Sequence, residues 1–159
     1  MKPRVYIETS ILSYLTALPS RDVIQAARQQ LTLAWWSRRH DYDLFVSDPV
    51  LAEARRGDPT AAGRRLDAAV GIPVLSGAEE AEALAADLLA KAAMPPKAVL
   101  DAAHVAIAAV HGLDFLLTWN CTHIANATMR PRIEAICKGY GFPPPIICTP
   151  DELLPQEDL

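Results

Sequence analysis

The alternation of short β-rich runs with longer helical segments is the feature that most constrains the fold. Apolar runs at residues 5–7, 44–46, 72–75, 115–118 and 146–147 predict five strands, each bounded by turn or helix signals. Strands separated by helices need crossover connections, which favour a parallel arrangement with helices on both faces of the sheet. We therefore expect an α/β three-layer sandwich around a mainly parallel, roughly five-stranded sheet.

Capping residues and helical periodicity fill the intervals between these strands. The predicted caps are Thr9 or Ser10, Asp48, Ser76 with Glu79, Asn120, and Thr149 with Glu152. The predicted helices cover residues 9–15, 21–40, 48 to about 56, a segment ending near 70, 76–93, 99–111, 120 to about 139, and a short tail from 149. Gly112 is placed as the stop signal of its helix.

The length and composition indicate one globular domain spanning residues 1–159. The chain is 51% hydrophobic and 21% charged, which is typical of neither a disordered segment nor a coiled-coil rod. Its formal net charge of −4 does not indicate a nucleic-acid-binding protein by bulk electrostatics. Acidic residues gathered at a metal site would escape this objection, because bound cations reverse the local charge.

The cysteine pattern and the lack of long apolar segments predict a cytoplasmic location. Cys121, Cys137 and Cys148 are odd in number and form no C-x-x-C pair, which argues against a disulfide framework and a zinc site. No hydrophobic signal region precedes residue 5, and no apolar stretch is long enough to span a bilayer. We therefore expect a cytoplasmic protein without a membrane association.

Four polar residues are expected near the carboxyl edge of the predicted sheet. Glu8 and Asn120 follow strands, Glu53 lies one helical turn beyond a strand, and Asp101 begins a nearby helix. Two carboxylates at ~4 Å repel by about 1 kcal/mol in water and about 4 kcal/mol at an effective dielectric of 20, so a shared cleft needs a cation or protons. Hard oxygen ligands suit Mg²⁺ or Mn²⁺, which favours phosphodiester chemistry.

Four short motifs occur in a recognisable order. They are Val5-Tyr6-Ile7-Glu8-Thr9-Ser10, the helical Glu53, Asp101-Ala102-Ala103-His104 and Leu117-Thr118-Trp119-Asn120. Together they resemble the PIN domain, especially the VapC-type toxins of prokaryotic toxin–antitoxin pairs, over nearly the whole chain. The resemblance implies a Mg²⁺- or Mn²⁺-dependent RNA endonuclease, a homodimer and a cognate antitoxin, with Glu8, Glu53, Asp101 and Asn120 at the four site positions.

The chain departs from the usual pattern of that family at two positions. Glu8 stands where the family generally has Asp, and Asn120 stands where it often has Asp. Glu8 is longer by about 1.5 Å, and Asn120 removes one negative charge, so a second tightly held metal becomes less favourable. We therefore expect one ion on Asp101 and Glu8, with Glu53 holding its waters and Asn120 holding a water or supporting the ligands.

Structural explanations also exist for each site residue. Asn120 is fully explained as a helix cap, Asp101 can complement a helix dipole, and Glu53 can pair with Arg56. The hydroxyl of Thr9 or Ser10 could bond a ligand carboxylate, although a cap is the plainer interpretation. Two histidines are set aside: His104 as a buried, hydrogen-bonded core residue, and His123, with Asn126, as peripheral.

Other side chains have candidate roles in binding RNA or a second subunit. Trp35 and Trp36 are interpreted as core or dimer contacts, whereas Trp119 could be a core residue or a base-stacking platform. The arginines considered as phosphate contacts, or simply as solvated residues, are Arg55, Arg56, Arg64, Arg65, Arg130 and Arg132.

Two other functions compete with the nuclease. A PIN-like domain without catalysis would be a binding or regulatory module, and the two departures favour it, whereas the retained Asp101 and Glu53 oppose it. A phosphorylated receiver domain needs an acidic pair after its first strand and a lysine after its last, and the sequence has neither.

Overall fold

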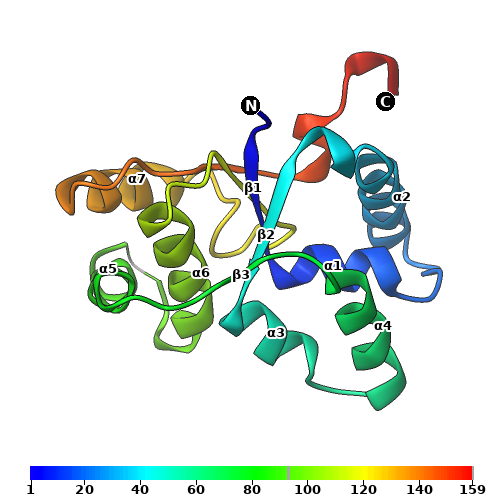
Figure 1. Ribbon diagram of the computed structural model, residues 1–159, viewed down its shortest axis with the longest axis horizontal. Helices are drawn as coiled ribbons and strands as arrows, with labels where there is room; N and C mark the ends of the chain where they lie inside the picture. Colours follow the sequence, from blue (N-terminus) through cyan, green and yellow to red (C-terminus); the bar gives the residue numbers. More distant parts are fainter. Residues whose placement is uncertain (93, 159) are drawn as a thin grey trace.

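The computed structural model describes residues 1–92 and 94–158 as a parallel sheet flanked by helices (Figure 1). The strands are β1 (Arg4–Ile7), β2 (Asp43–Ser47), β3 (Val74–Leu75), β4 (Phe115–Leu117) and β5 (Ile146–Cys148). The α-helices are α1 (Thr9–Thr16), α2 (Val23–Ser37), α3 (Asp48–Ala54), α4 (Pro59–Ala69), α5 (Glu79–Lys91), α6 (Val99–Val110) and α7 (Arg130–Gly139). Short 3-10 helices are η1 (Arg39–Asp41), η2 (Pro96–Ala98), η3 (Pro150–Leu153) and η4 (Gln156–Asp158).

The five strands pair in parallel in the order β3-β2-β1-β4-β5, which confirms the predicted α/β architecture. The first strand is central, and Ile7 stands opposite Leu117 in the register of β1 with β4. The chain adds β2 and β3 on one side of β1 and then crosses to add β4 and β5 on the other, so the order reverses between β1 and β4. The crevice beyond the carboxyl ends of strands at such a point is where parallel α/β sheets place their ligands.

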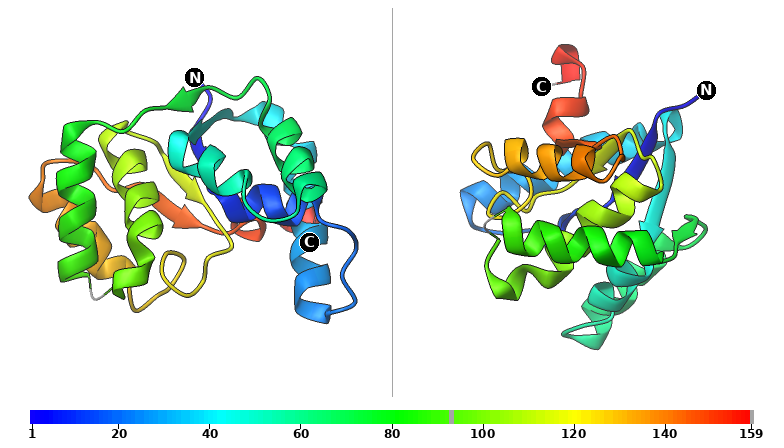
Figure 2. Two further views of the ribbon diagram at one scale, coloured as in Figure 1. Left: turned by 90° about the horizontal axis from the view of Figure 1, so that it is seen from below. Right: turned by 90° about the vertical axis from the view of Figure 1, so that its left-hand side faces the viewer.

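Helices cover the sheet from two sides. Helices α1, α2 and α4 lie on one side of the strands in Figure 1, and α5, α6 and α7 lie on the other. Helix α5 packs along α6 (Figure 2). Strands β1, β4 and β5 and helix α6 bury most of their side chains, as expected for the central part of a parallel sheet covered on both faces. The largest fully buried side chains are Trp35, Tyr6, Ile7, Ile11, Leu12, Leu84, Leu88, Leu116, Leu117, Ile124, Ile133 and His104.

The prediction of a helix from Asn120 to about residue 139 is wrong for the first half of that range. Residues 121–124 and 127–129 form turns with irregular backbone between them, and α7 begins only at Arg130, with Pro131 in its first turn. The side chain of Asn126 bonds the carbonyl of Cys121 and the backbone N–H of Thr128. Short polar side chains that bond nearby backbone groups compete with the helical ladder, and this segment is rich in them.

Smaller differences affect helix ends. The box predicted at Ser76 and Glu79 does not form, because α5 begins after Ala78 without a side-chain cap. Its predicted end at residue 93 lies outside the described residues. The box at Thr149 and Glu152 does form, on the 3-10 turn η3 instead of an α-helix. In the part of the chain that the structure describes, no helix combines the length and apolar character needed to cross a membrane.

Candidate metal centre

Glu8 follows β1 directly and is almost completely buried, with 4% of its surface exposed. Its backbone N–H continues the sheet by donating to the Leu117 carbonyl at 3.1 Å. Carboxylate oxygen Oε2 accepts hydrogen bonds from the Ser10 backbone N–H (3.0 Å), the Ser10 hydroxyl and the Thr118 hydroxyl (2.8 Å). Oxygen Oε1 has no hydrogen-bond donor among the described residues and lies 4.0 Å from His104 Nε2. The protein thus fixes one oxygen and leaves the other available.

The cap of α1 is Glu8 rather than the predicted Thr9 or Ser10. A carboxylate at this position can accept the free N–H groups of the first helical turn, so the two hydroxyls are not needed there. Both hydroxyls instead donate to acidic side chains: Ser10 to Glu8, and Thr9 to Glu53 at 2.9 Å. Bonding of these hydroxyls to acidic side chains was the alternative that the sequence analysis considered less favoured than helix capping.

Glu53 reaches the same place from α3, whose first turn follows β2. Ser47 caps this short helix with its hydroxyl, and Pro49 occupies the first turn. Oxygen Oε1 of Glu53 accepts from the Thr9 hydroxyl and lies in hydrogen-bond contact with His104 Nε2, at 2.5 Å. Burial by itself would raise the pKa of Glu53, but these two donors and the charges of His104 and Arg56 outweigh it and hold the pKa below its ordinary value.

His104 is a residue of the candidate site that the sequence interpretation had set aside. It is fully buried, as predicted, but its partner is the Glu53 carboxylate. On its other side, Nδ1 lies 2.7 Å from the Tyr6 hydroxyl, which lies 2.6 Å from the Ser47 hydroxyl. Burial opposes the charged imidazole, but the Glu53 hydrogen bond and the surrounding carboxylates raise the pKa of His104 above its ordinary value. The available signal was its position one turn after Asp101, on the same helix face.

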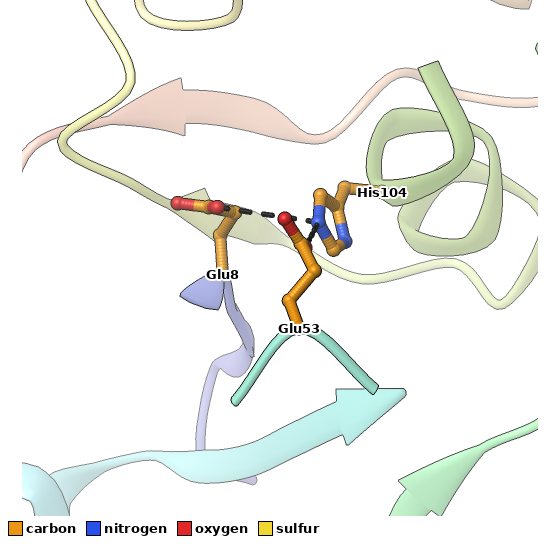
Figure 3. Close-up of side chains that lie close together, drawn as sticks. All are labelled: Glu8, Glu53 and His104. Atoms are coloured by element: carbon orange, nitrogen blue, oxygen red, sulfur yellow. Dashed lines mark hydrogen bonds and ion pairs between the residues drawn. The ribbon is translucent and has the colours of Figure 1, made fainter. Parts of the chain in front are cut away.

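One ligand atom from each of Glu8, Glu53 and His104 lies within 4.8 Å of the other two, so this group could hold a metal ion (Figure 3). We call these three residues the inner group. The side chains converge from β1, α3 and α6, as Figure 3 shows. Each glutamate keeps one oxygen, Oε1 of Glu8 and Oε2 of Glu53, without a hydrogen-bond donor among the described residues. Two free carboxylate oxygens fit a hard divalent cation such as Mg²⁺ or Mn²⁺.

Asp101 and Asn120 lie together in a separate set with His123, which we call the outer group. Asp101 Oδ1 accepts from Asn120 Nδ2 at 2.9 Å, and Oδ2 lies 2.8 Å from His123 Nδ1. Asn120 Oδ1 accepts from the His123 backbone N–H at 3.0 Å, so this side chain closes a turn while it holds Asp101. The outer group therefore brings together two of the four predicted site residues and adds His123.

A single residue links the two groups. The Thr118 hydroxyl donates to Glu8 Oε2 and accepts from the Asn120 backbone N–H at 2.9 Å. The Asp101 charge also contributes to the raised pKa of His104. All four predicted residues thus lie at the carboxyl edge of the sheet. Two of them, Glu8 and Glu53, belong to the inner group, in which the ligand atoms lie within 4.8 Å of one another, and Asp101 does not.

Most of the arginines considered as phosphate contacts bind backbone carbonyls or lie in solvent. Arg64 donates to the Thr16 carbonyl at 3.0 Å, and Arg65 donates to the Ala54 carbonyl at 3.1 Å. Nη2 of Arg130 lies 4.0 Å from the Glu152 carboxylate. The exposed ones are Arg55, Arg56 and Arg132.

Arg28 on α2 is a cation beside the site that the sequence interpretation did not consider. Its guanidinium lies 5.3 Å from the Trp119 ring centroid and 5.9 Å from that of Tyr14. Nη2 lies 3.8 Å from the sulfur of Cys121, the residue after Asn120. Trp119 itself is buried and donates from its indole to the Thr32 hydroxyl at 2.7 Å, so packing rather than base stacking explains its position.

Comparisons with known proteins find similarity in structure. No protein-family model and no curated protein sequence matches this chain significantly. The crystal structure of VapC20 of Mycobacterium tuberculosis, described as a toxin that cleaves the sarcin–ricin loop, matches 74% of this chain and 91% of its own, with a TM-score of 0.57 and 19% identity. A chain of Rickettsia felis VapBC2, solved with a DNA fragment from its promoter, matches 92% of this chain and 98% of its own, with a TM-score of 0.52 and 14% identity.

These matches show that the chain has the fold of the VapC toxins, the PIN-domain fold, over most of its length. The resemblance inferred from four short motifs is thereby confirmed at the level of the fold. A shared fold does not by itself establish an activity, because one fold can carry several functions.

Proposed function

We propose that this protein is a divalent-metal-dependent endoribonuclease that hydrolyses RNA phosphodiester bonds, with Glu8, Glu53, Asp101 and Asn120 forming its site. The observation that carries the proposal is the pair of glutamates in the inner group. They come from separate elements and converge beyond the carboxyl ends of the strands, next to the point where the strand order reverses. Each presents one oxygen without a donor among the described residues. A VapC-type fold around such a pair favours Mg²⁺ or Mn²⁺ as the resident ion.

Electrostatics supports a cation at this position. Two carboxylates at ~4 Å repel by about 4 kcal/mol at an effective dielectric of 20. His104 offsets part of that repulsion, but it contacts Glu53 at 2.5 Å and stands 4.0 Å from Glu8. The charge of Glu8 is therefore met mainly by neutral donors. A divalent ion beside Glu8 Oε1 would supply the missing positive charge.

The residues divide the work of the reaction. When bound, the ion lowers the pKa of a coordinated water and polarises the scissile phosphate. Glu8, Asp101 and Glu53 would hold it, with Glu53 oriented by His104 and Thr9. Asn120 would keep the Asp101 carboxylate aimed at the site. The attacking water forms the new P–O bond and gives up a proton, while the departing ester oxygen leaves the phosphorus and takes one.

RNA as the substrate and an antitoxin as the partner are supported by the two structural matches. One matching protein is described as a toxin that cleaves the sarcin–ricin loop, and the other was solved within a VapBC complex. We propose a cognate antitoxin for this chain on that basis, and homodimerisation stays a prediction. Light scattering of the purified protein, alone and after co-expression with the product of any neighbouring reading frame for a small DNA-binding protein, measures both.

The proposed activity is tested by incubating total cellular RNA with the protein in Mg²⁺, Mn²⁺ or EDTA, beside an Asp101→Ala variant. Asp67→Ala is a matched control, because Asp67 is exposed on α4 away from the carboxylates. We expect cleavage in either metal with the native protein and the control, and none with EDTA or Asp101→Ala. Equal cleavage by the native protein and Asp101→Ala would show that the activity comes from a contaminant and would contradict the proposal.

A further inference from the structure

A buried chain of hydrogen bonds runs behind the inner group. It connects the Ser47 hydroxyl to the Tyr6 hydroxyl (2.6 Å), the Tyr6 hydroxyl to His104 Nδ1 (2.7 Å), and His104 Nε2 to Glu53 Oε1 (2.5 Å). Ser47, Tyr6 and His104 are each fully buried. The series of hydrogen bonds starts at Ser47 at the end of β2, continues through residues of β1 and α6, and ends at Glu53 on α3. Four elements of the fold therefore determine where one oxygen of Glu53 lies.

When the imidazole of His104 is neutral, one arrangement of protons satisfies each hydroxyl of this series of hydrogen bonds. The Ser47 oxygen already accepts from the Val50 backbone N–H as a helix cap. Its own proton then has one available acceptor among the described residues, the Tyr6 oxygen. At alkaline pH, where the imidazole is neutral, the Tyr6 proton then donates to His104 Nδ1, which is the unprotonated ring nitrogen. The remaining ring proton is on Nε2 and points at Glu53.

The opposite tautomer conflicts with the geometry. A proton on Nδ1 alone would leave the Nε2 lone pair facing the ionised Glu53 oxygen at 2.5 Å, with two acceptors in contact. A metal ion bound to both atoms at about 2.0–2.1 Å would make an angle well below the roughly 90° that octahedral Mg²⁺ prefers, so this separation suits a shared proton better than a shared ion. A proton on Nε2 satisfies both atoms.

We propose that His104 is a positioning residue and not a metal ligand: Ser47 and Tyr6 hold its proton on Nε2, and this proton fixes Glu53 Oε1 so that Oε2 faces the ion. The proposal rests on the metal site of the proposed function. It separates two interpretations of the inner group, in which the imidazole either joins the carboxylates around the ion or orients one of them from behind. Mutation of a residue that orients a metal ligand in this way commonly lowers metal affinity or activity by about 10–100-fold.

The tautomer can be measured directly by NMR. Long-range ¹H–¹⁵N correlation of the metal-free protein at alkaline pH, with a His104→Gln variant for assignment, reports which ring nitrogen carries the proton. We expect a protonated Nε2 and an unprotonated Nδ1. Saturating Mg²⁺ should leave the Nε2 signal in the protonated range. A proton on Nδ1, or loss of the Nε2 proton when Mg²⁺ binds, would overturn the proposal.

Substitutions separate orientation from ligation. His104→Gln keeps an N–H donor at the place of Nε2, whereas His104→Leu has none, and Mn²⁺ affinity is read from the free-ion signal in electron paramagnetic resonance. We expect about 10-fold weaker binding with leucine and within about 3-fold of native affinity with glutamine. Equal losses in both variants would identify His104 as a ligand.

Tyr6→Phe tests the more distant part of the chain. It removes the hydroxyl that fixes the tautomer, so we expect the proton to redistribute between the ring nitrogens and Mn²⁺ affinity to fall. Tyr42→Phe is the matched control, because its hydroxyl contacts only the Leu153 carbonyl, at 3.5 Å, among the described residues. An unchanged tautomer and affinity in a folded Tyr6→Phe protein would contradict the proposal. If the native protein bound no Mn²⁺, the proposed function would fail, and the NMR result would still decide the tautomer independently.

Discussion

The inner and outer groups use the same kind of side chain but hold it in different ways. Glu8 and Glu53 each have one oxygen fixed by several donors and one oxygen free of donors among the described residues. Asp101 has one donor on each oxygen, and both donors come from the turn that follows β4. The inner carboxylates are therefore preorganised by elements of the sheet and its helices, whereas the outer carboxylate depends on one irregular segment.

Exposure distinguishes two of the three inner side chains from the outer group. The side chains of His104 and Glu8 are 0% and 6% exposed, whereas those of Asp101 and His123 are 18% and 19% exposed. The third inner side chain, Glu53, is 23% exposed and forms the solvent-facing part of the inner group. Burial strengthens each electrostatic interaction, but it also makes an unmatched charge more costly. We infer that the inner group contributes most of the affinity for the ion, and that Asp101 is a further ligand whose position depends on the turn that carries Asn120 and His123.

The largest expected effect comes from Glu8→Gln. The change removes a buried charge and places an amide beside the hydroxyls that now donate to Glu8 Oε2, so Mn²⁺ affinity should fall by roughly 100-fold or more. Titration of free Mn²⁺ measures the loss. The fold should persist by circular dichroism, because removing a buried carboxylate also removes its desolvation cost. Native affinity in this variant would place the ion elsewhere.

A smaller effect is expected for His123→Ala. Asp101 would keep its Asn120 donor and lose one of its two partners, so kcat for RNA should fall about 10-fold while Mn²⁺ affinity changes little. Asn126→Ala serves as the control, since it loosens the same segment without touching Asp101. Equal losses in both variants would show that the segment as a whole, and not its contact with Asp101, matters.

The pH dependence of stability should sharpen the description of the inner group. His104 has a pKa raised above its unfolded value of about 6.5, so its stabilising contribution is complete below that pH and is lost as pH rises through the raised pKa. A tenfold change in an acid dissociation constant on folding corresponds to about 1.4 kcal/mol of stability. Glu53, whose pKa is lowered, contributes above its unfolded value of about 4.3 and loses that contribution as acid protonates it.

Urea unfolding of the metal-free protein from pH 5.5 to 9 measures the histidine component. The free energy of unfolding should fall toward alkaline pH in the native protein, and His104→Gln should lack this component because glutamine does not titrate. The same slope in both proteins would assign the pH dependence to other groups.

The smallest expected effect concerns Arg28 beside the outer group. Among the described residues no carboxylate lies within 4.0 Å of its guanidinium, so a substrate phosphate could meet this charge. Arg28→Gln should raise KM for RNA a few-fold and reduce the slope of log affinity against log salt by about 0.7. Arg21→Gln, an exposed arginine just before α2, should leave both unchanged.

The sheet could be predicted from sequence because each strand is a local apolar run bounded by clear signals. The approach of Glu8 to Glu53 also followed, since residues after parallel strands share one edge. The role of His104 did not follow, because its partner is 51 residues away and only packing brings them together. The turns after Asn120 were missed because Asn126 offers the backbone local bonds that compete with a helix.

The central position of β1 has a consequence for synthesis on the ribosome. Strand β1 is synthesised before β4, with which it pairs, and Glu8 accepts its hydrogen bond from Thr118, which lies 110 residues later in the sequence. At translation rates of about 5–20 residues per second, that interval lasts roughly 5–20 s, during which the N-terminal segment has no partner on one side. The acidic cluster therefore assembles only after residue 118 has emerged, and a nascent chain that stops before this residue cannot carry a complete site.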